Sequence, residues 1–546
     1  MGNATTKNNG GAAIELDVVI VGAGFAGLYM LYRLREMGLK AKVYEAGDGI
    51  GGTWYWNRYP GAACDIESVI YSYSFSPELD EEWSWSERYA RQPEILRYMN
   101  FVADRFDLRK DIQLNTRVTV AHFDEAQQRW RVETDKGERI SATYCVMATG
   151  SLSAPKTVDI PGFEKYQGEK YFTAHWPKEG VDFTGKRVGV IGTGSSGIQS
   201  IPIIAEQAAH LTIFQRTPNF SIPARNFKVT PEQQKDMKAR YAEMRRRHYD
   251  SQIGLVGGVE MVPTLTTTAL AATPEERERE YQYRWDVGGL YFYTSYTDLL
   301  MSEEANETAA EFVRKKIRET VKDPKTAELL CPKGYPFGAK RICSDTGYYE
   351  TFNRDNVELV DLHTTPIECF TANGLKLSDR DIELDAIVIA MGFDAMTGAL
   401  FSIDIRGRDG MKLKDKWVAG PSTYLGLMTA GFPNLFITTG PGSPSVMFNM
   451  ITGNEQHVNW IVDCIDHMRK SGLHTIEATP EAEQKWSAHL IEVGEATLFV
   501  KANSWYLGAN VPGKPRVILP YLGGFNTYWR KCDEVVANGY EGFIAA

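Results

Sequence analysis

Short apolar runs, glycine-rich turns and amphipathic segments follow one another along the chain in the order that parallel α/β sheets require. Residues 17–21 (Asp-Val-Val-Ile-Val) form a run that predicts a buried strand. Three glycines come next, and the apolar spacing over residues 28–37 predicts a helix. A second apolar run, over residues 42–44, ends at Glu45. Strand, glycine turn, helix, strand and acid together form the fingerprint of a Rossmann-like dinucleotide-binding fold.

The same plan recurs further along the chain. Residues 187–191 (Arg-Val-Gly-Val-Ile) predict a strand, a second glycine turn follows, and a helix extends through residue 208 to a strand over 211–214. Arg216 follows this strand, where the first unit has an acid. Because the two second strands end differently, we expect two different nucleotides. The predicted fold class is therefore α/β, with two Rossmann-like dinucleotide-binding domains.

Two further apolar runs, over residues 144–150 and 386–392, end in glycine, where we expect the chain to cross between domains. Thr230 and Thr273 each precede proline and have Gln or Glu three residues later, which predicts helix starts with capping boxes. We therefore predict that the second domain is inserted in the first, with a mainly helical insertion. The predicted bounds are 1–150 and 386–546 for the first domain, 151–225 and 331–385 for the second, and 226–330 for the helical insertion.

Composition narrows the class of protein. The formal charge of −10, from 60 Lys and Arg against 70 Asp and Glu, argues against a nucleic-acid binder. The 7 cysteines include no C-x-x-C, and the chain has no H-E-x-x-H and no G-x-S-x-G, so we expect no metal site and no serine esterase. The start, residues 1–11, is polar and looks disordered. We expect a cytoplasmic protein without a membrane segment or an obligatory protein partner.

The first glycine loop has the residues that a dinucleotide needs. Gly22 allows the tight turn, Gly24 lets a pyrophosphate approach the backbone, and Gly27 lets the helix pack closely on the strand. The free N–H groups at the helix start favour the phosphates. Glu45 suits the hydroxyls of an unphosphorylated ribose, which favours FAD or NAD. The alternative is a tight turn without a ligand.

The second loop, Gly192-x-Gly194-x-x-Gly197, favours a phosphorylated nucleotide. The guanidinium of Arg216 offers a fork of donors suited to a phosphate, which favours NADP over NAD. Thr217 adds a hydroxyl, and Lys340 would add a second positive charge if the fold brings it near. An arginine with a purely structural role at the strand end is the alternative.

Residues 51–65 hold four tryptophan and tyrosine rings among glycines and a proline, and the segment ends at Asp65. The rings predict either a rigid wall for a flat cofactor or an ordinary aromatic core, and the sequence leaves both open. Arg341 follows another loop, and its permanent charge would stabilise an anion that forms during turnover. Asp65 is a candidate to hold Arg341 in place, although sequence alone does not show their contact.

With these residues in view, the chain resembles the type I Baeyer–Villiger monooxygenases, a family of class B flavoprotein oxygenases. The family pattern [A/G]-G-x-W-x4-[F/Y]-P-[G/M]-x3-D is met at every position from Gly51 to Asp65. The likeness covers essentially the whole chain, including the segments 353–357, 440–445 and 504–510. Within the family it looks closest to members that act on aryl ketones and steroids.

Two positions depart from the family. In the pattern F-x-G-x3-H-x3-W-P, Tyr166 replaces the phenylalanine, Phe172 stands at the histidine position, and His175 lies three residues late. The family histidine belongs to a linker thought to coordinate domain movement. Met391 stands where an A-T-G-F-D run is usual.

The resemblance implies an FAD- and NADPH-dependent enzyme, with FAD in the first domain and NADP in the second. It implies that one oxygen atom from O2 is inserted next to the carbonyl of a small-molecule ketone, through a C4a-peroxyflavin, to give an ester or lactone. The cofactor carries the reactive chemistry and the protein supplies position and electrostatics. The alternatives are a flavin monooxygenase acting on nitrogen or sulfur and, from another class, a non-enzymatic redox-sensing nucleotide-binding protein.

The resemblance also implies residue roles. It makes Arg341 the catalytic arginine and Asp65 its orienting partner. The implied FAD contacts are Gly22, Gly24, Gly27, Glu45, Thr53, Trp54, Tyr55, Trp56, Asp65, Tyr71 and the backbone of Val118. The implied NADP contacts are Ala63, Cys64, Asp65, Thr193, Gly194, Ser195, Ser196, Gly197, Ile198, Gln199, Arg216, Thr217, Lys340, Arg341 and Trp505.

Overall fold

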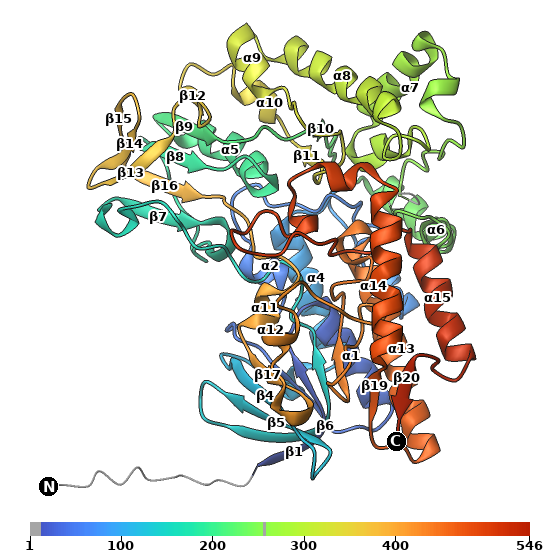
Figure 1. The fold of residues 1–546 in the computed structure, drawn as a ribbon. Helices are drawn as coiled ribbons and strands as arrows, with labels where there is room; N and C mark the ends of the chain where they lie inside the picture. Colours follow the sequence, from blue (N-terminus) through green and yellow to red (C-terminus); the bar gives the residue numbers. More distant parts are fainter. Residues whose placement is uncertain (1–12, 255–257) are drawn as a thin grey trace, which may run out of the picture.

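Two sheets that contain parallel strands organise the molecule, one at each end of the view in Figure 1. The computed structural model describes residues 13–254 and 258–546. The predicted polar start, residues 1–11, lies outside the described residues. Within the described ranges, no helix combines the length and the apolar character needed to cross a membrane.

The first sheet has eight strands in the order β17-β4-β5-β6-β1-β2-β3, and β18 pairs with β6. Helices α1 (Phe25–Glu36) and α13 (Met450–Ser471) share a buried core with β1 and β6. The strands are β1 (Ile14–Val21), β2 (Ala41–Tyr44), β3 (Ile112–Gln113), β4 (Val118–Asp124), β5 (Arg129–Thr134), β6 (Arg139–Met147), β17 (Asp404–Arg406) and β18 (Leu435–Ile437).

The second sheet has five parallel strands in the order β12-β9-β8-β16-β7. They are β12 (Val357–Asp361), β9 (His210–Gln215), β8 (Arg187–Ile191), β16 (Ala386–Ile389) and β7 (Glu169–Phe172), and helix α5 (Ser195–Gln207) follows β8. The predicted boundary at residue 386 is therefore a few residues early. Ala386 pairs with Val188, so the chain leaves the second sheet after β16.

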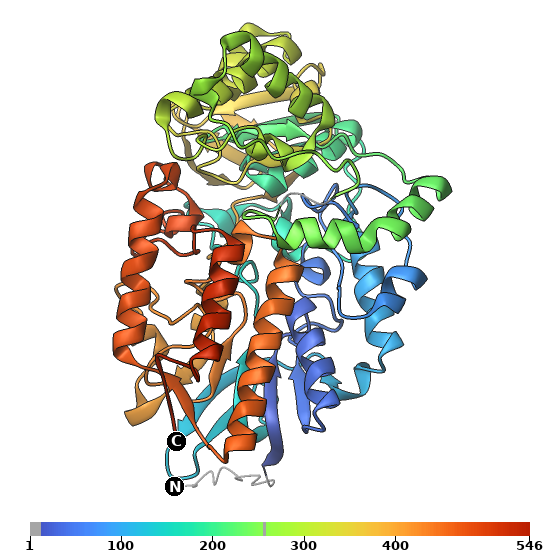
Figure 2. The same ribbon diagram turned by 90° about the vertical axis from the view of Figure 1, so that its right-hand side faces the viewer.

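The predicted helical insertion contains α6 (Pro231–Tyr249), α7 (Pro274–Val287), α8 (Glu303–Thr320) and α9 (Pro324–Leu330). The capping boxes predicted at Thr230 and Thr273 are confirmed. The insertion is divided between the two cores, however. Met237, Tyr241 and Met244 of α6 belong to the core of the first sheet, whereas buried residues of α7, α8 and α9 belong to that of the second. In Figures 1 and 2, α7 to α9 cap the second sheet and α6 lies below them.

Shorter elements complete the described chain. They are α2 (Thr53–Trp56), α3 (Pro77–Glu82), α4 (Gln92–Arg105), β10 (Ser221–Pro223), β11 (Cys343–Asp345), α10 (Tyr348–Thr351), β13 (Ile367–Thr371), β14 (Gly374–Leu377), β15 (Asp381–Glu383), α11 (Gly398–Phe401), α12 (Leu413–Lys416), β19 (Ile476–Ala478), α14 (Pro480–Glu495), α15 (Phe525–Ala537) and β20 (Phe543–Ala545).

Candidate functional site

The first glycine loop connects β1 to α1 and leaves no room for side chains at two positions. Gly22 has φ of +106°, and a Cβ there would lie 2.5 Å from the carbonyl oxygen of Ala148. A Cβ on Gly27 would lie 1.9 Å from the carbonyl oxygen of Gly22. Helix α1 starts after Gly24 without a side-chain cap, so its first N–H groups are not used by a capping side chain.

The second glycine loop repeats this geometry between β8 and α5. Gly192 has φ of +110° with Ala390 O at 2.5 Å, and a Cβ on Gly197 would lie 2.2 Å from Gly192 O. Gly194 differs, because a Cβ there would meet no atom within 4 Å. Open space and an uncapped helix start coincide at Gly194, which fits a pyrophosphate group.

Glu45 ties the first glycine loop to the end of β2. Its buried carboxylate accepts N–H groups from Ala23 and Gly47, each at 2.8 Å. A carboxylate has about four lone-pair sites, so two remain for ribose hydroxyls. Its backbone carbonyl accepts the N–H of Thr116, 2.8 Å away, which brings the predicted site residue Val118 at the start of β4 into the same region.

The aromatic segment resolves the two interpretations of its rings differently from residue to residue. Trp54 and Tyr55 are buried, and Trp54 Nε1 donates to the hydroxyl of Tyr71 at 3.0 Å. Trp56 is half-buried and its ring packs edge-on against His175, with ring centroids 5.5 Å apart. Thr53, at the start of α2, is exposed. The first two rings are therefore core, and only Trp56 and Thr53 remain partly open.

Contacts between the end of this segment and α5 bring the two glycine loops together. Gln199 on α5 accepts the hydroxyl of Tyr59 at 2.8 Å and donates to Ala63 O at 3.1 Å. A Cβ on Gly61 would lie 2.2 Å from the carbonyl oxygen of Gln199, so glycine permits this approach. In the second loop, the hydroxyl of Thr193 donates to Thr217 O at 3.2 Å. The predicted NADP residues 193–199 and 63–65 thus lie together.

Positive charge gathers where β9 ends. Arg216 is exposed there, and the Lys340 ammonium lies 4.4 Å from the ring centroid of Tyr335. Tyr335 in turn donates to Pro218 O at 2.8 Å, which fixes this loop beside the strand end. Burial, and then the charge of Arg216, lower the pKa of Lys340. The structure therefore brings together the two cations that the sequence named separately.

Asp65 and Arg341 meet, as the sequence left open. Arg341 Nε lies 3.4 Å from Asp65 Oδ2, and Arg341 Nη1 donates to Val446 O at 3.2 Å. Burial acts to lower the pKa of Arg341, but the Asp65 carboxylate outweighs it and the pKa rises. Burial raises the pKa of Asp65, and Arg341 opposes that rise. Asp65 Oδ1 is buried without a hydrogen-bond partner among the described residues, so it retains acceptor capacity for a bound group.

Sequence analysis missed two tyrosines beside Arg341. Tyr293, from the segment after α7, and Tyr506 both lie close enough for their charges to affect the pKa of Arg341. Burial raises the pKa of Tyr506 to about 12, so its phenol is neutral. Its ring contacts that of Trp505, with centroids 4.4 Å apart. Adjacency to Trp505 was the available signal for Tyr506, whereas no motif marks Tyr293.

The departures from the family pattern have structural counterparts. Phe172 ends β7, and its ring packs against Phe163 at 6.0 Å, so it contributes to an apolar cluster. His175, which contacts Trp56, has its pKa lowered by burial and is neutral. Met391 packs against the same cluster as Phe172. The histidine contact to the aromatic segment therefore exists in this chain, from a different position.

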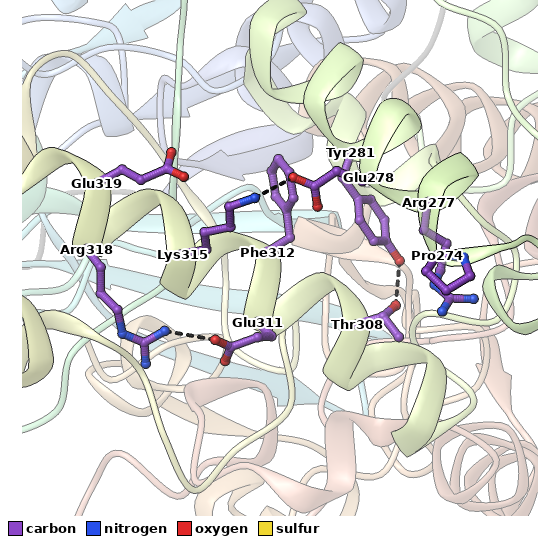
Figure 3. Close-up of a pocket in the computed structure, with 10 residues that line it drawn as sticks. All are labelled: Pro274, Arg277, Glu278, Tyr281, Thr308, Glu311, Phe312, Lys315, Arg318 and Glu319. Atoms are coloured by element: carbon purple, nitrogen blue, oxygen red, sulfur yellow. Dashed lines mark hydrogen bonds and ion pairs between the residues drawn. The ribbon is translucent and has the colours of Figure 1, made fainter.

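A surface pocket of about 510 Å³ between α7 and α8 lies apart from these residues. Figure 3 shows its charges paired, Lys315 with Glu278 and Arg318 with Glu311. None of the predicted site residues lines it. The cleft of interest is therefore the one between the glycine loops.

Comparisons with known proteins extend this picture. The family model described as pyridine nucleotide-disulphide oxidoreductase matches residues 19–268. A Baeyer–Villiger monooxygenase of Pseudooceanicola batsensis is 41% identical over 99% of this chain and 98% of its own length.

Two solved structures are similar over nearly the whole chain. Oxidized steroid monooxygenase bound to NADP has a TM-score of 0.92 and 52% identity, covering 97% of this chain and 99% of its own. The OTEMO complex with FAD and NADP (form 4) has a TM-score of 0.93 and 40% identity, covering 98% and 100%.

This chain belongs to the Baeyer–Villiger monooxygenases. The α/β fold with Rossmann-like domains, which the sequence predicted, is confirmed. The chain is an NADPH-dependent flavoprotein monooxygenase that uses FAD and NADP and acts on small molecules. The roles of the individual residues, and the division into domains, stay predictions.

Proposed function

We propose that this Baeyer–Villiger monooxygenase inserts one atom of O2 beside the carbonyl of a ketone, with Arg341 as its catalytic residue. The observation that supports this most directly is the Asp65–Arg341 pair, which joins the aromatic segment of the first domain to the loop before β11. The pair lies where the two glycine loops converge. Bound FAD, reduced by NADPH, would supply the activation of O2.

Arg341 stabilises negative charge during the reaction. Its guanidinium stays protonated at every working pH, because a nearby carboxylate raises a pKa that is already high. Its side chain is only 25% exposed, so its field on a developing oxyanion is weakly screened. A cation fixed before the anion forms does not have to reorganise as charge develops.

Asp65 orients Arg341 and limits its motion. Its Oδ2 faces Arg341 Nε, and the Val446 carbonyl takes a proton from Nη1 on another side of the guanidinium. Two acceptors on different nitrogens fix the plane of the group, and neither of them uses Nη2. We infer that this nitrogen faces the reacting oxygen.

The two glycine loops hold the cofactors by the chemistry of their backbones. The loop of Gly22, Gly24 and Gly27, with Glu45, binds the FAD diphosphate and ribose, and the loop of Gly194 binds NADP. The aromatic segment and Gln199 keep the two cofactors in one cleft and exclude water from it. The identity of the ketone and the cytoplasmic location stay predictions, and no contact favours a substrate nitrogen or sulfur over a carbonyl.

The substitution Arg341→Ala tests the proposal. Loss of one such charge-stabilising donor typically slows catalysis by about a hundred- to thousandfold, so ketone-dependent product formation should fall at least that far. Flavin reduction by NADPH should persist, since it needs no oxyanion stabilisation. The measurements are stopped-flow flavin bleaching without oxygen and mass analysis of products from a ketone panel.

Arg354→Ala is a matched control, because Arg354 sits in the loop after α10 and contacts Asn356 rather than the cleft. It should leave both rates unchanged. Ester formation by the Arg341 variant at the parent rate would overturn the assignment. Turnover of thioethers or amines with no turnover of any ketone would overturn the proposed reaction.

A further inference from the structure

A third cation lies at the edge of the second sheet where Arg216 and Lys340 gather. Lys156 follows the first chain crossing, and its N–H donates to Gly392 O at 3.1 Å. The neighbouring Pro155 forms a bridge with Phe393. These backbone contacts place Lys156 just beyond the carboxyl end of β16. Strand β16 lies beside β8, whose carboxyl end carries Gly192 and Gly194, and β9 with Arg216 lies on the other side of β8.

The charges at this edge are not balanced within the protein. Lys156 and Lys340 are both half-buried, and Arg216 is exposed. Across residues 13–254 and 258–546, none of the three lies within ion-pair distance of a carboxylate, although the chain as a whole is acidic. Burial, and next the charge of Arg216, lower the pKa of Lys156, as they do for Lys340. Two ammonium groups thus lie near one guanidinium.

Like charges held together without a carboxylate destabilise a fold unless an anion joins them. The pyrophosphate of NADP is expected at Gly194, at the start of α5. The ribose lies at the end of the second strand of a Rossmann unit, which here is β9 with Arg216. The anion that reaches this place is therefore the 2'-phosphate.

We propose that Lys156 binds the 2'-phosphate of NADPH together with Arg216 and Lys340, approaching from the β16 side of the glycine loop. Lys156 then helps the enzyme to select NADPH over NADH. The inference rests on the assignment of NADP to the second loop. No motif marks Lys156, because it lies outside the glycine loop and reaches the site only through the pairing of residues 155–156 with residues 392–393.

The test measures binding of nucleotide fragments to the flavin-loaded enzyme by calorimetry. For Lys156→Met we expect the dissociation constant of 2',5'-ADP to rise about tenfold, or about 1.4 kcal/mol, with that of 5'-AMP nearly unchanged. Lys156→Arg should bind 2',5'-ADP nearly as well as the parent. In steady-state assays, the ratio of kcat/KM for NADPH to that for NADH should fall in the Met variant by a similar factor.

Two reference variants keep the outcomes distinct. Lys186→Met removes a lysine from the opposite edge of the sheet, where Lys186 pairs with Glu169, and should change neither dissociation constant. Arg216→Ala should weaken 2',5'-ADP binding on its own. If Arg216→Ala has this effect and Lys156→Met does not, the proposal for Lys156 is overturned. If neither variant alters 2',5'-ADP binding, the assignment of the 2'-phosphate to this edge is wrong.

Discussion

His457 shows how a single buried side chain can set the response of this fold to acid. The residue lies on α13, its Nδ1 accepts the N–H of Thr439 at 2.8 Å, and its Nε2 lies 2.9 Å from the hydroxyl of Tyr528. The Tyr528 hydroxyl donates to Leu425 O at 2.7 Å, so the Nε2 of His457 carries the proton. Burial lowers the pKa of His457 to about 3. The folded state therefore requires a neutral imidazole.

The consequence is a loss of stability in mild acid. A histidine in the unfolded chain binds a proton below its ordinary pKa of 6.5, whereas the folded one does so only near 3. In that window the unfolded state binds more protons, so the free energy of unfolding falls as pH falls, by up to about 1.4 kcal/mol per pH unit.

We expect His457→Gln to flatten this pH dependence by up to one proton between pH 6.5 and pH 4. Glutamine keeps an acceptor for the Thr439 N–H but does not titrate. Denaturant unfolding followed at several pH values gives the slope, and His363→Gln, at an exposed position, is the control that should keep the parent slope. Equal slopes in the parent and the His457 variant would contradict the assigned linkage.

At the scale of the element, the strand–glycine–helix units separate residues needed for folding from residues needed for binding. In the second unit a Cβ on Gly197 would collide with the backbone of Gly192, whereas a Cβ on Gly194 would project into open space. Gly194 also has an ordinary negative φ of −84°. The same motif therefore contains one glycine required by packing and one required by the ligand.

This contrast predicts opposite phenotypes for two alanine substitutions. Gly197→Ala should lower the free energy of unfolding by about 1–3 kcal/mol, as overpacking does. Gly194→Ala should leave the unfolding transition nearly unchanged and weaken NADP+ binding more than tenfold, about 1.4 kcal/mol or more. Thermal unfolding and fluorescence titration with NADP+ measure the two effects. Normal NADP+ affinity in Gly194→Ala would show that the pyrophosphate does not approach this glycine.

Local sequence predicted these units well because each depends on contacts within a few dozen residues. The strand at 17–21, the helix after Gly194 and both capping boxes are set by periodicity and by neighbouring residues. The surroundings of Arg341 were predictable only in part. Tyr293 approaches it from the helical insertion, across long sequence separation and without a motif, and the sequence left the Asp65 contact open. Assignment of β16 to the second sheet likewise depends on pairing that no local pattern encodes.

At the scale of the whole molecule, a buried ion pair fixes the helical insertion to the first domain. Arg88 Nε donates to Glu67 Oε1 at 2.9 Å, and the side chains are 1% and 3% exposed. Arg88 Nη1 also donates to Val287 O at 2.7 Å, and Tyr291 donates to Glu67 Oε1 at 2.9 Å. Glu67 is two residues from Asp65, so the pair connects the insertion to the segment that holds Arg341.

Removing one partner of this pair should cost far more than removing both. Arg88→Met leaves the Glu67 charge buried among apolar rings, a situation that typically costs about 3–5 kcal/mol, whereas replacing both charges by methionine should cost much less. Arg105→Met, which breaks the exposed pair with Glu82, should leave unfolding nearly unchanged. Denaturant unfolding of the three variants measures these differences. Because the pair ties the insertion to the Asp65 segment, Arg88→Met should also slow ketone oxygenation while flavin content stays normal. Equal losses of stability in the single and the double variant would mean that Arg88 contributes by packing rather than by pairing with Glu67.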